Sequence, residues 1–240
     1  MKKTSTDKEI KISNKRIKKV AKGKASNDDV FVLCKASKLS LNDKFMKYEP
    51  RTKNEKEFKE LLEKAIKNGV RDFYRPKFDP SIDEQGKIFY GNGNTPVVGK
   101  TYAWWKEKAD NFWPKRKSRI GRHDEYIAFL GTVIKKLLKV GWGIEDAWNA
   151  VCNDSAVLGH YWNSPNNKCR CIEPTGSREV AGFFDLANTH KILSNGKGGI
   201  YTAGGSAYDD GDYTPLASLW PYDRWNITNE YGVGWIVLEK

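Results

Sequence analysis

The chain has 240 residues, of which 39% are hydrophobic and 30% charged, and it includes nine Trp and eleven Tyr. A chain of this length and aromatic content can bury a sizeable core, which excludes a mostly disordered polymer. Its four cysteines are too few for a disulfide scaffold. It has neither an apolar run of roughly 20 residues nor an apolar segment behind the basic N-terminus. We therefore expect a cytoplasmic protein with reduced thiols and no membrane partner.

The net charge of +12 is unevenly distributed along the chain. Residues 1–24 hold ten Lys and Arg against two acids, whereas residues 172–240 hold five against nine. Residues 1–28 also contain few large apolar side chains, so they are predicted to form a flexible basic arm. The sequence leaves two interpretations of this arm open, a solvated segment without a partner and a contact with nucleic acid or an acidic partner.

Residues 29–119 are predicted to form a helical and loop region. Its clearest element is a helix over 55–67, where apolar residues recur at the helical spacing. A short strand is expected over 30–33. The Pro, Gly and Asp content of residues 71–99 indicates a loop with short extended pieces, of which 87–90 is the clearest.

A second helix is predicted over 101–112, and it carries Trp104 and Trp105. Aromatic rings beside clustered Lys and Arg can bind nucleic acid by stacking and phosphate contact. At helical spacing, however, Trp side chains are more often part of a core, and the sequence favours that interpretation for these two. A basic cluster that could bind nucleic acid follows the helix, and its members are Lys115, Arg116, Lys117, Arg119 and Arg122.

Residues 120–240 are predicted to form the main domain. It begins with a helical hairpin, in which a helix over 124–140 has acids in its first turn and Lys in its last, as the helix dipole favours. A short helix over 144–151 completes the hairpin. Residues 163–176 are a loop by composition, and residues 177–193 combine a strand or short helix with a turn.

Two strands, over 199–205 and 233–238, frame a C-terminal segment rich in aromatic and short polar residues. Tyr and Trp give contact area at low entropic cost, while Ser, Asn and Asp adapt their hydrogen bonds, so this composition is typical of a recognition surface. The candidate ligand-binding residues are Ser206, Tyr208, Asp209, Asp210, Asp212, Tyr213, Tyr222, Asp223, Trp225, Asn226, Thr228, Asn229 and Tyr231.

Four residues could supply the ligands of a structural zinc site, namely Cys152, His160, Cys169 and Cys171. Their spacing is irregular and lacks paired C-x-x-C knuckles, which favours ordinary reduced thiols. The chain contains no phosphate-binding glycine loop, no G-x-S-x-G elbow and no H-E-x-x-H pair. We therefore expect no catalytic residue, no metal and no cofactor.

Three C-terminal motifs carry a resemblance to a known fold. They are Gly176–Asp185 (GSREVAGFFD), Gly199–Ser206 (GIYTAGGS) and Val233–Leu238 (VGWIVL). Together they resemble the C-type-lectin-like module of the formylglycine-generating-enzyme type. Among the users of that module, they most resemble the variable proteins of diversity-generating retroelements. The resemblance covers about residues 120–240 and implies an α+β fold whose hypervariable region, at the C-terminus, lines a ligand-binding face.

The resemblance also implies which residues vary and which form the scaffold. Mutagenesis directed at the adenines of Asn-type codons cannot produce Trp, Glu, Lys, Gln or Met. Within 206–231 only Trp220, Trp225 and Glu230 are of these types. The implied scaffold consists of Gly204, Gly205, Pro215, Leu216, Ala217, Leu219 and the 233–238 strand. Neither the basic arm nor the basic cluster belongs to the family's pattern.

These observations favour a non-enzymatic ligand-binding protein with a hypervariable C-terminal surface, encoded on a phage or another mobile element. Its expected ligand is a protein or another macromolecular surface. The alternative is a nucleic-acid-binding or host-interference protein that acts through the basic arm and the Lys115–Arg122 cluster. An enzyme is a third hypothesis, for which the sequence offers no acid, base or nucleophile constellation. The sequence leaves open whether the chain forms a homo-oligomer.

Overall fold

The structure is a computed structural model that describes residues 31–76, 79–90, 97–153, 190–194, 196, 200–203, 219–222, 228–229 and 232–240. The predicted arm, the 163–176 loop and most of the 177–193 segment lie outside these residues. The described part is a mixed α+β fold, which confirms the predicted class. None of its helices is long and apolar enough to cross a membrane.

All four predicted helices are present in the described part, with ends that differ from the prediction by at most two residues. The first of them begins at a side-chain cap. Thr52 and Glu55 form a reciprocal capping box at the first helix, in which each side chain accepts the other's backbone N–H. The helices are α3 (Lys53–Lys67), α4 (Tyr102–Phe112), α5 (His123–Lys139) and α6 (Ile144–Cys152), with the short 3-10 helices η1 (Ala36–Lys38), η2 (Lys44–Lys47) and η3 (Pro114–Arg116).

The described strands form two four-stranded sheets and two short ladders. The first sheet is antiparallel and has the order β1 (Phe31–Cys34), β2 (Phe73–Pro76), β12 (Ile236–Glu239), β6 (Ser118–Ile120). The second sheet has the order β11 (Gly232–Gly234), β7 (His190–Ser194), β8 (Ile200–Ala203), β9 (Leu219–Tyr222), and only its β11–β7 pair is parallel. The ladders join β3 (Pro80–Ile82) to β4 (Ile88–Tyr90), and β5 (Lys100–Thr101) to β10 (Thr228–Asn229).

The 71–99 segment contains short extended pieces, as its composition predicts, and β4 (Ile88–Tyr90) confirms the one expected over 87–90. Another of them, β2, lies inside the first sheet between β1 and β12, where pairing on both sides holds it within turn-rich surroundings. One strand prediction needs correction. The expected single strand over 233–238 is divided at Trp235 into β11 and β12, which belong to different sheets.

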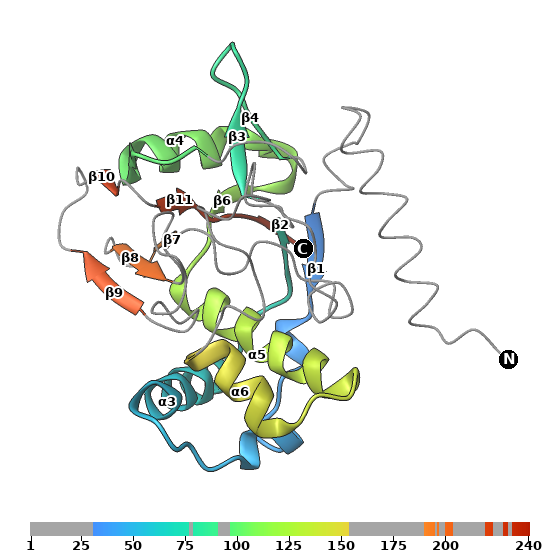
Figure 1. The fold of residues 1–240 in the computed structure, drawn as a ribbon. Coiled ribbons are helices and arrows are strands. Elements are labelled where there is room, and N and C mark those ends of the chain that lie inside the picture. The colour runs from blue at the N-terminus through green and yellow to red at the C-terminus, as the bar shows by residue number, and fades with distance from the viewer. Residues whose placement is uncertain are drawn as a thin grey trace, which may run out of the picture.

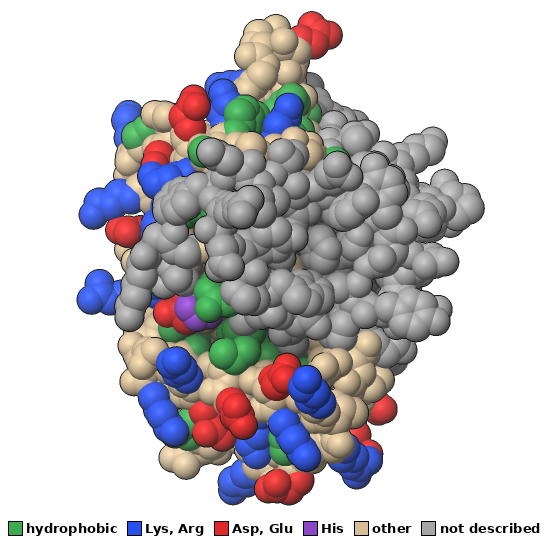
Figure 2. Space-filling model, turned by 90° about the vertical axis from the view of Figure 1, so that its left-hand side faces the viewer, with side chains coloured by type: hydrophobic (Ala, Val, Ile, Leu, Met, Phe, Trp, Pro, Cys, Tyr) green, Lys and Arg blue, Asp and Glu red, His purple; other side chains and the backbone are tan. Residues whose placement is uncertain are grey.

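The helices cover opposite ends of the molecule (Figure 1). Helices α3, α5 and α6 pack together at one end, while α4 and the β3–β4 hairpin lie at the other, with the sheets between them. In Figure 2, the end of the molecule that holds α3, α5 and α6 carries Lys and Arg side chains interspersed with Asp and Glu side chains. That mixture is typical of a solvated helical surface, because opposite charges alternate on it.

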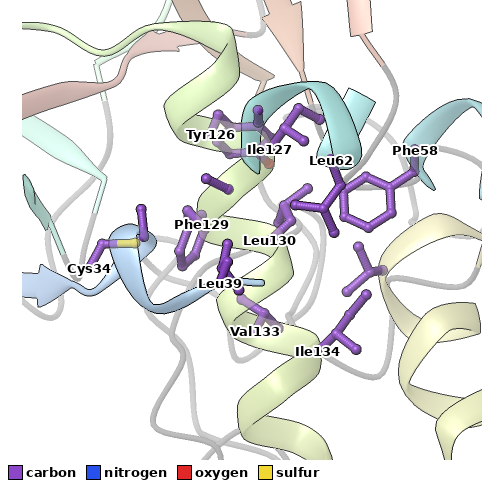
Figure 3. Packing of buried hydrophobic residues seen from close by; sticks show 14 of the residues in the cluster. Cys34, Leu39, Phe58, Leu62, Tyr126, Ile127, Phe129, Leu130, Val133 and Ile134 are labelled. Atoms are coloured by element: carbon purple, nitrogen blue, oxygen red, sulfur yellow. The ribbon is translucent and has the colours of Figure 1, made fainter. Parts of the chain in front are cut away.

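The larger core lies between α3 and α5 (Figure 3). Phe58 and Leu62 of α3 pack against Leu130 and Ile134 of α5, and all four side chains are almost completely buried. The second core surrounds α4, where Trp105 is completely buried. These interdigitated apolar side chains supply most of the stabilisation of the fold.

Residues on both sides of position 119, the expected end of the N-terminal region, contribute to the same sheet and the same core. Strand β12 lies between β2 and β6. The ring of Trp235 packs 5.6 Å from Phe73 and 5.4 Å from Tyr126, as measured between centroids. Trp235, Ile236 and Leu238, which lie in the 233–238 strand of the implied scaffold, are core residues, because each is at most 4% exposed. The N-terminal region and the C-terminal strands are thus interleaved.

Candidate ligand-binding surface and its frame

The segment that carries the predicted recognition residues leaves and rejoins the fold at the second sheet. Strands β8 and β9 form an antiparallel pair in which Ala203 lies opposite Leu219. The two ends of the 204–218 segment are therefore held side by side. After β10 the chain returns to this sheet as β11, where Gly232 lies opposite His190 of β7. Paired strands of this kind give an intervening segment a fixed base.

Three of the thirteen predicted ligand-binding residues lie on described strands. Tyr222 ends β9, where it pairs with Ile200 of β8, and Thr228 and Asn229 form β10. The prediction that the thirteen share one exposed face stays a prediction. The other ten lie outside the described residues, and they are Ser206, Tyr208, Asp209, Asp210, Asp212, Tyr213, Asp223, Trp225, Asn226 and Tyr231.

Strand β10 lies against β5, the short strand immediately before α4. Thr228 pairs with Thr101, and Asn229 pairs with Lys100. Thr101 is also the N-cap of α4, since its Oγ1 accepts the backbone N–H of Trp104 at 3.1 Å. The predicted recognition segment is therefore tied to the start of α4 as well as to the second sheet.

A close backbone approach holds β11 against α4. A Cβ atom at Gly234 would lie only 2.6 Å from Cδ2 and Cε3 of the Trp105 indole, so the strand and the ring touch directly. Gly121 lies in a similar way against the ring of Trp235. The backbone N–H of Trp235 donates to Ile192 in the second sheet, and its carbonyl accepts from Gly121 at the end of the first. Trp235 thus joins the two sheets.

The N-terminus of α5 also contacts the second sheet. The imidazole of His123 stacks on the ring of Tyr201 in β8, with 4.8 Å between centroids. Arg122 forms an isolated bridge with Ser194 of β7. In the part of the chain that the structure describes, no group of three potential metal ligands is present. The ring of His123 thus packs against β8 by stacking.

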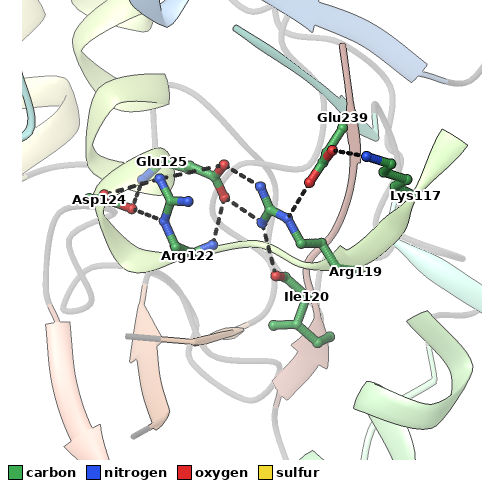
Figure 4. Close-up of polar contacts among 7 residues, drawn as sticks. All are labelled: Lys117, Arg119, Ile120, Arg122, Asp124, Glu125 and Glu239. Atoms are coloured by element: carbon green, nitrogen blue, oxygen red, sulfur yellow. Dashed lines mark hydrogen bonds and ion pairs between the residues drawn. The ribbon is translucent and has the colours of Figure 1, made fainter. Parts of the chain in front are cut away.

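Two members of the predicted basic cluster are paired with carboxylates (Figure 4). The guanidinium of Arg119 makes a bidentate pair with Glu125, at N···O distances of 2.6 and 2.9 Å. The Glu125 side chain is only 5% exposed. Arg122 donates from Nε to Asp124 at 2.9 Å. Because these pairs engage both guanidinium groups, they leave less positive charge for an external partner.

The other three members of the basic cluster lie exposed around η3. Lys117 lies 3.6 Å from Glu239, as measured between Nζ and the carboxylate. Arg116 lies over two aromatic rings, and Lys115 forms no ion pair within the described residues. The structure thus divides the five residues between internal ion pairs and an exposed remainder.

The described thiols are buried in the helical core. Cys152, at the end of α6, is completely buried, and burial raises the pKa of its thiol. Burial likewise raises the pKa of Cys34 to about 11. Both are free, and such groups behave as small apolar side chains. The other three residues that could supply ligands of a zinc site lie outside the described residues, and they are His160, Cys169 and Cys171.

An interior ion pair is present that the sequence analysis does not predict. Lys191 of β7 donates to Asp79 at 2.7 Å, and the two side chains are 7% and 6% exposed. Two phenols, Tyr90 and Tyr126, have their pKa values raised by burial and by the charge of Asp79. Their hydroxyls find no hydrogen-bond partner among the described residues. Lys191, which directly precedes the apolar residues Ile192 and Leu193 in β7, is the one local signal of this pair.

Comparison with known proteins adds no family to these observations. The sequence matches no protein-family model, no curated protein and no solved structure. The function must therefore be inferred from the residues of this chain and from the way the fold holds them.

Proposed function

We propose that this chain is a non-enzymatic binding protein whose residues 206–231 form a variable recognition surface on the second sheet. Its organisation would be that of the C-type-lectin-like variable proteins of diversity-generating retroelements. Its ligand would be a protein or another macromolecular surface. The observation that carries the proposal is the anchoring of this segment, which is held by β8 and β9 at its start, by β5 at β10, and by β7 at its end.

Anchoring supports the proposal because it separates the residues that hold the fold from the residues that could vary. Val233, Trp235 and Ile236, which follow the segment, are each at most 4% exposed. Their burial fixes the end of the segment whatever side chains precede it. Side chains on a rigid base lose little entropy on binding, so an aromatic and polar surface held in this way suits recognition.

The alternative, nucleic-acid binding through the whole Lys115–Arg122 cluster, receives less support. Arg119 and Arg122 already bind carboxylates of this chain at 2.6 to 2.9 Å. Recruiting Arg119 to a phosphate would break its pair with the buried Glu125, and breaking such a pair is strongly destabilising.

A display library tests the proposal directly. The thirteen candidate positions, from Ser206 to Tyr231, would be randomised on the cell surface and selected against purified proteins such as lysozyme and serum albumin. We expect binders that differ only at these positions, with melting temperatures close to that of the original chain, because the buried residues Val233, Trp235 and Ile236 that follow the segment are unchanged.

A matched library provides the control. It would randomise the thirteen exposed positions on helices α3, α5 and α6, and we expect no binders from it. Equal enrichment from both libraries would refute the proposal. It would also be refuted if most members of the first library failed to fold and to appear on the cell surface. The gene gives a second test. We expect a nearby reverse transcriptase and a near-repeat of the 3′ end that differs from it at adenines.

A further inference from the structure

Asp79 and Lys191 form an interior ion pair that joins two parts of the fold far apart in the chain. Asp79 directly precedes β3, and Lys191 belongs to β7, which lies between β11 and β8 in the second sheet. Their side chains are 6% and 7% exposed, and Lys191 Nζ lies 2.7 Å from the Asp79 carboxylate. Buried charges of this kind are stable only where further polar groups satisfy their remaining hydrogen-bonding positions. Polar groups near the pair are therefore candidates for those positions.

Tyr90 approaches the pair from the β3–β4 hairpin. It lies opposite Pro80, the residue that follows Asp79, so the ladder holds Tyr90 and Asp79 close together. Tyr90 is 6% exposed, and its hydroxyl oxygen is buried without a hydrogen-bond partner among the described residues. Burial and the charge of Asp79 together raise the pKa of this phenol well above its ordinary value.

Tyr126 approaches the same pair from the N-terminal part of α5 (Figure 3). Its ring centroid lies 5.4 Å from that of Trp235, whose backbone N–H donates to the carbonyl of Ile192, the neighbour of Lys191. Tyr126 is 1% exposed, and in the described part of the chain its hydroxyl also has no hydrogen-bond partner. Burial and the charge of Asp79 raise the pKa of this phenol as well. One carboxylate thus acts on two buried phenols.

We call Asp79, Lys191, Tyr90 and Tyr126 the interior polar cluster. A buried hydroxyl that makes no hydrogen bond is destabilising, because it has given up its bonds to bulk water and gained nothing in return. Proteins satisfy most such groups with their own atoms or with buried water. Buried water is common, at about one molecule per 27 residues, and each molecule makes about three hydrogen bonds to buried polar groups. Two phenols and a carboxylate together supply that number of partners.

We propose that ordered water binds in the interior polar cluster and bridges the Tyr90 and Tyr126 hydroxyls to the Asp79 carboxylate. Each phenol would donate its O–H to a water oxygen, and water would donate to the carboxylate. A carboxylate has about four acceptor positions, so it can accept from water as well as from Lys191. Water suits the site because it donates and accepts at once, whereas an apolar molecule would leave the hydroxyls unpaired. The bridge would connect β4 and α5 to β7, the strand that pairs with β11.

A high-resolution crystal structure of the full chain tests the proposal directly. We expect ordered water at about 2.5–3.0 Å from each phenol oxygen, with a path of hydrogen bonds from both phenols to Asp79. The structure of Tyr90→Phe/Tyr126→Phe provides the comparison. Because the rings remain and only the hydroxyls are removed, the packing should be unchanged and at least one of these water molecules should be lost.

The sign of the stability change gives a second test. If each hydroxyl is bonded to water, Tyr90→Phe and Tyr126→Phe should each lower the folding equilibrium constant by about fivefold, which corresponds to a fall of about 2–4 °C in melting temperature. A hydroxyl buried without water would give the opposite sign, because its removal relieves an unsatisfied donor. Tyr74→Phe is the matched control. Its ring is only half-buried, and its melting temperature should stay within about 1 °C of the original.

A third test asks whether the water is bonded to the ion pair. The Asp79→Leu/Lys191→Met variant removes both charges, so water near Tyr126 would lose the carboxylate to which it donates. In that background, Tyr126→Phe should lower the melting temperature by less than half as much as it does in the original chain.

The inference is overturned if the crystal structure shows either hydroxyl bonded to a side chain in place of water, or no path of ordered water from the phenols to Asp79. It is also overturned if either Tyr→Phe variant melts at or above the temperature of the original, or if the shift caused by Tyr126→Phe is the same in both backgrounds. None of these results depends on the recognition segment, so failure of this inference would leave the proposed function unaffected.

Discussion

Substitution of Gly234 by Ala tests the contact between strand β11, which follows the recognition segment, and the core around α4. The added Cβ would lie 2.6 Å from two atoms of the Trp105 indole and 2.8 Å from a third, Cγ. Neither side of this contact can easily move. Gly234 is paired with Ile192 in β7, and Trp105 is completely buried within the α4 core. The backbone of Gly234 is not in the left-handed region, so the cost would be steric.

The expected cost is about 3 kcal/mol, which is the upper part of the range for overpacking a well-packed core. For a chain of this size it corresponds to a fall of about 6–12 °C in melting temperature. Urea unfolding would measure it as a lower midpoint at an unchanged m-value. Gly131→Ala is the control, because its Cβ would meet Leu62 Cδ1 at 2.8 Å, and that atom is the end of a rotatable side chain.

In the control, the gain in helix propensity of up to about 1 kcal/mol should offset the contact, so its net change should be near zero. A double-mutant cycle then isolates the pair in question. Gly234→Ala and Trp105→Leu should couple by at least about 1 kcal/mol, since the smaller side chain makes room for the methyl group. The reasoning would be refuted if Gly234→Ala cost less than about 0.5 kcal/mol, or if the two changes were additive.

Three further predictions concern buried and charged groups. Lys191→Met should destabilise the fold by about 3–5 kcal/mol in urea unfolding because it removes the ammonium partner of the buried Asp79 carboxylate; adding Asp79→Leu should restore more than half, and a loss below about 1 kcal/mol in the single variant would contradict the pairing. At pH 8, Cys34 and Cys152 should react with a thiol reagent on the order of 100-fold more slowly than free cysteine, since burial raises both pKa values, and fast labelling in peptide mass spectra would contradict their burial. Partial burial alone would raise the pKa of Asp72, but hydrogen bonds from Lys240 and Ser37 lower it to about 2. Its contribution to stability should be complete above about pH 4 and be lost as the pH falls through 2, and an equal acid-induced loss in Asp72→Asn would argue against it.

The helices could be predicted from the sequence because their signals are local. Apolar residues at helical spacing predict α3 and α5, and capping residues such as Thr52 and Thr101 lie within three residues of the N–H groups that they satisfy. The strand β1 was predicted for the same reason, since its β-forming residues are consecutive. Signals of this kind require no knowledge of the rest of the chain.

Features that depend on distant partners could not be predicted in this way. Strand β2 owes its existence to neighbours that lie before and far after it in the chain. The pair of Asp79 and Lys191 joins residues 112 positions apart. The division of the last strand at Trp235 follows from hydrogen bonds to Ile192 in the second sheet and to Gly121, which directly follows β6 of the first sheet. In each case, the deciding contact joins residues that are distant in the chain, so the local sequence pattern hardly indicates it.

The predicted recognition segment is connected to helix α4 through one short ladder. Strand β10, inside that segment, pairs with β5, and the Lys100 of that pair also contacts the ring of Trp104. A ligand that shifts β10 would therefore also shift a residue that touches the first turn of α4. The ladder of Lys100 and Thr101 with Asn229 and Thr228 is the physical connection through which the recognition segment and the core around α4 could influence each other.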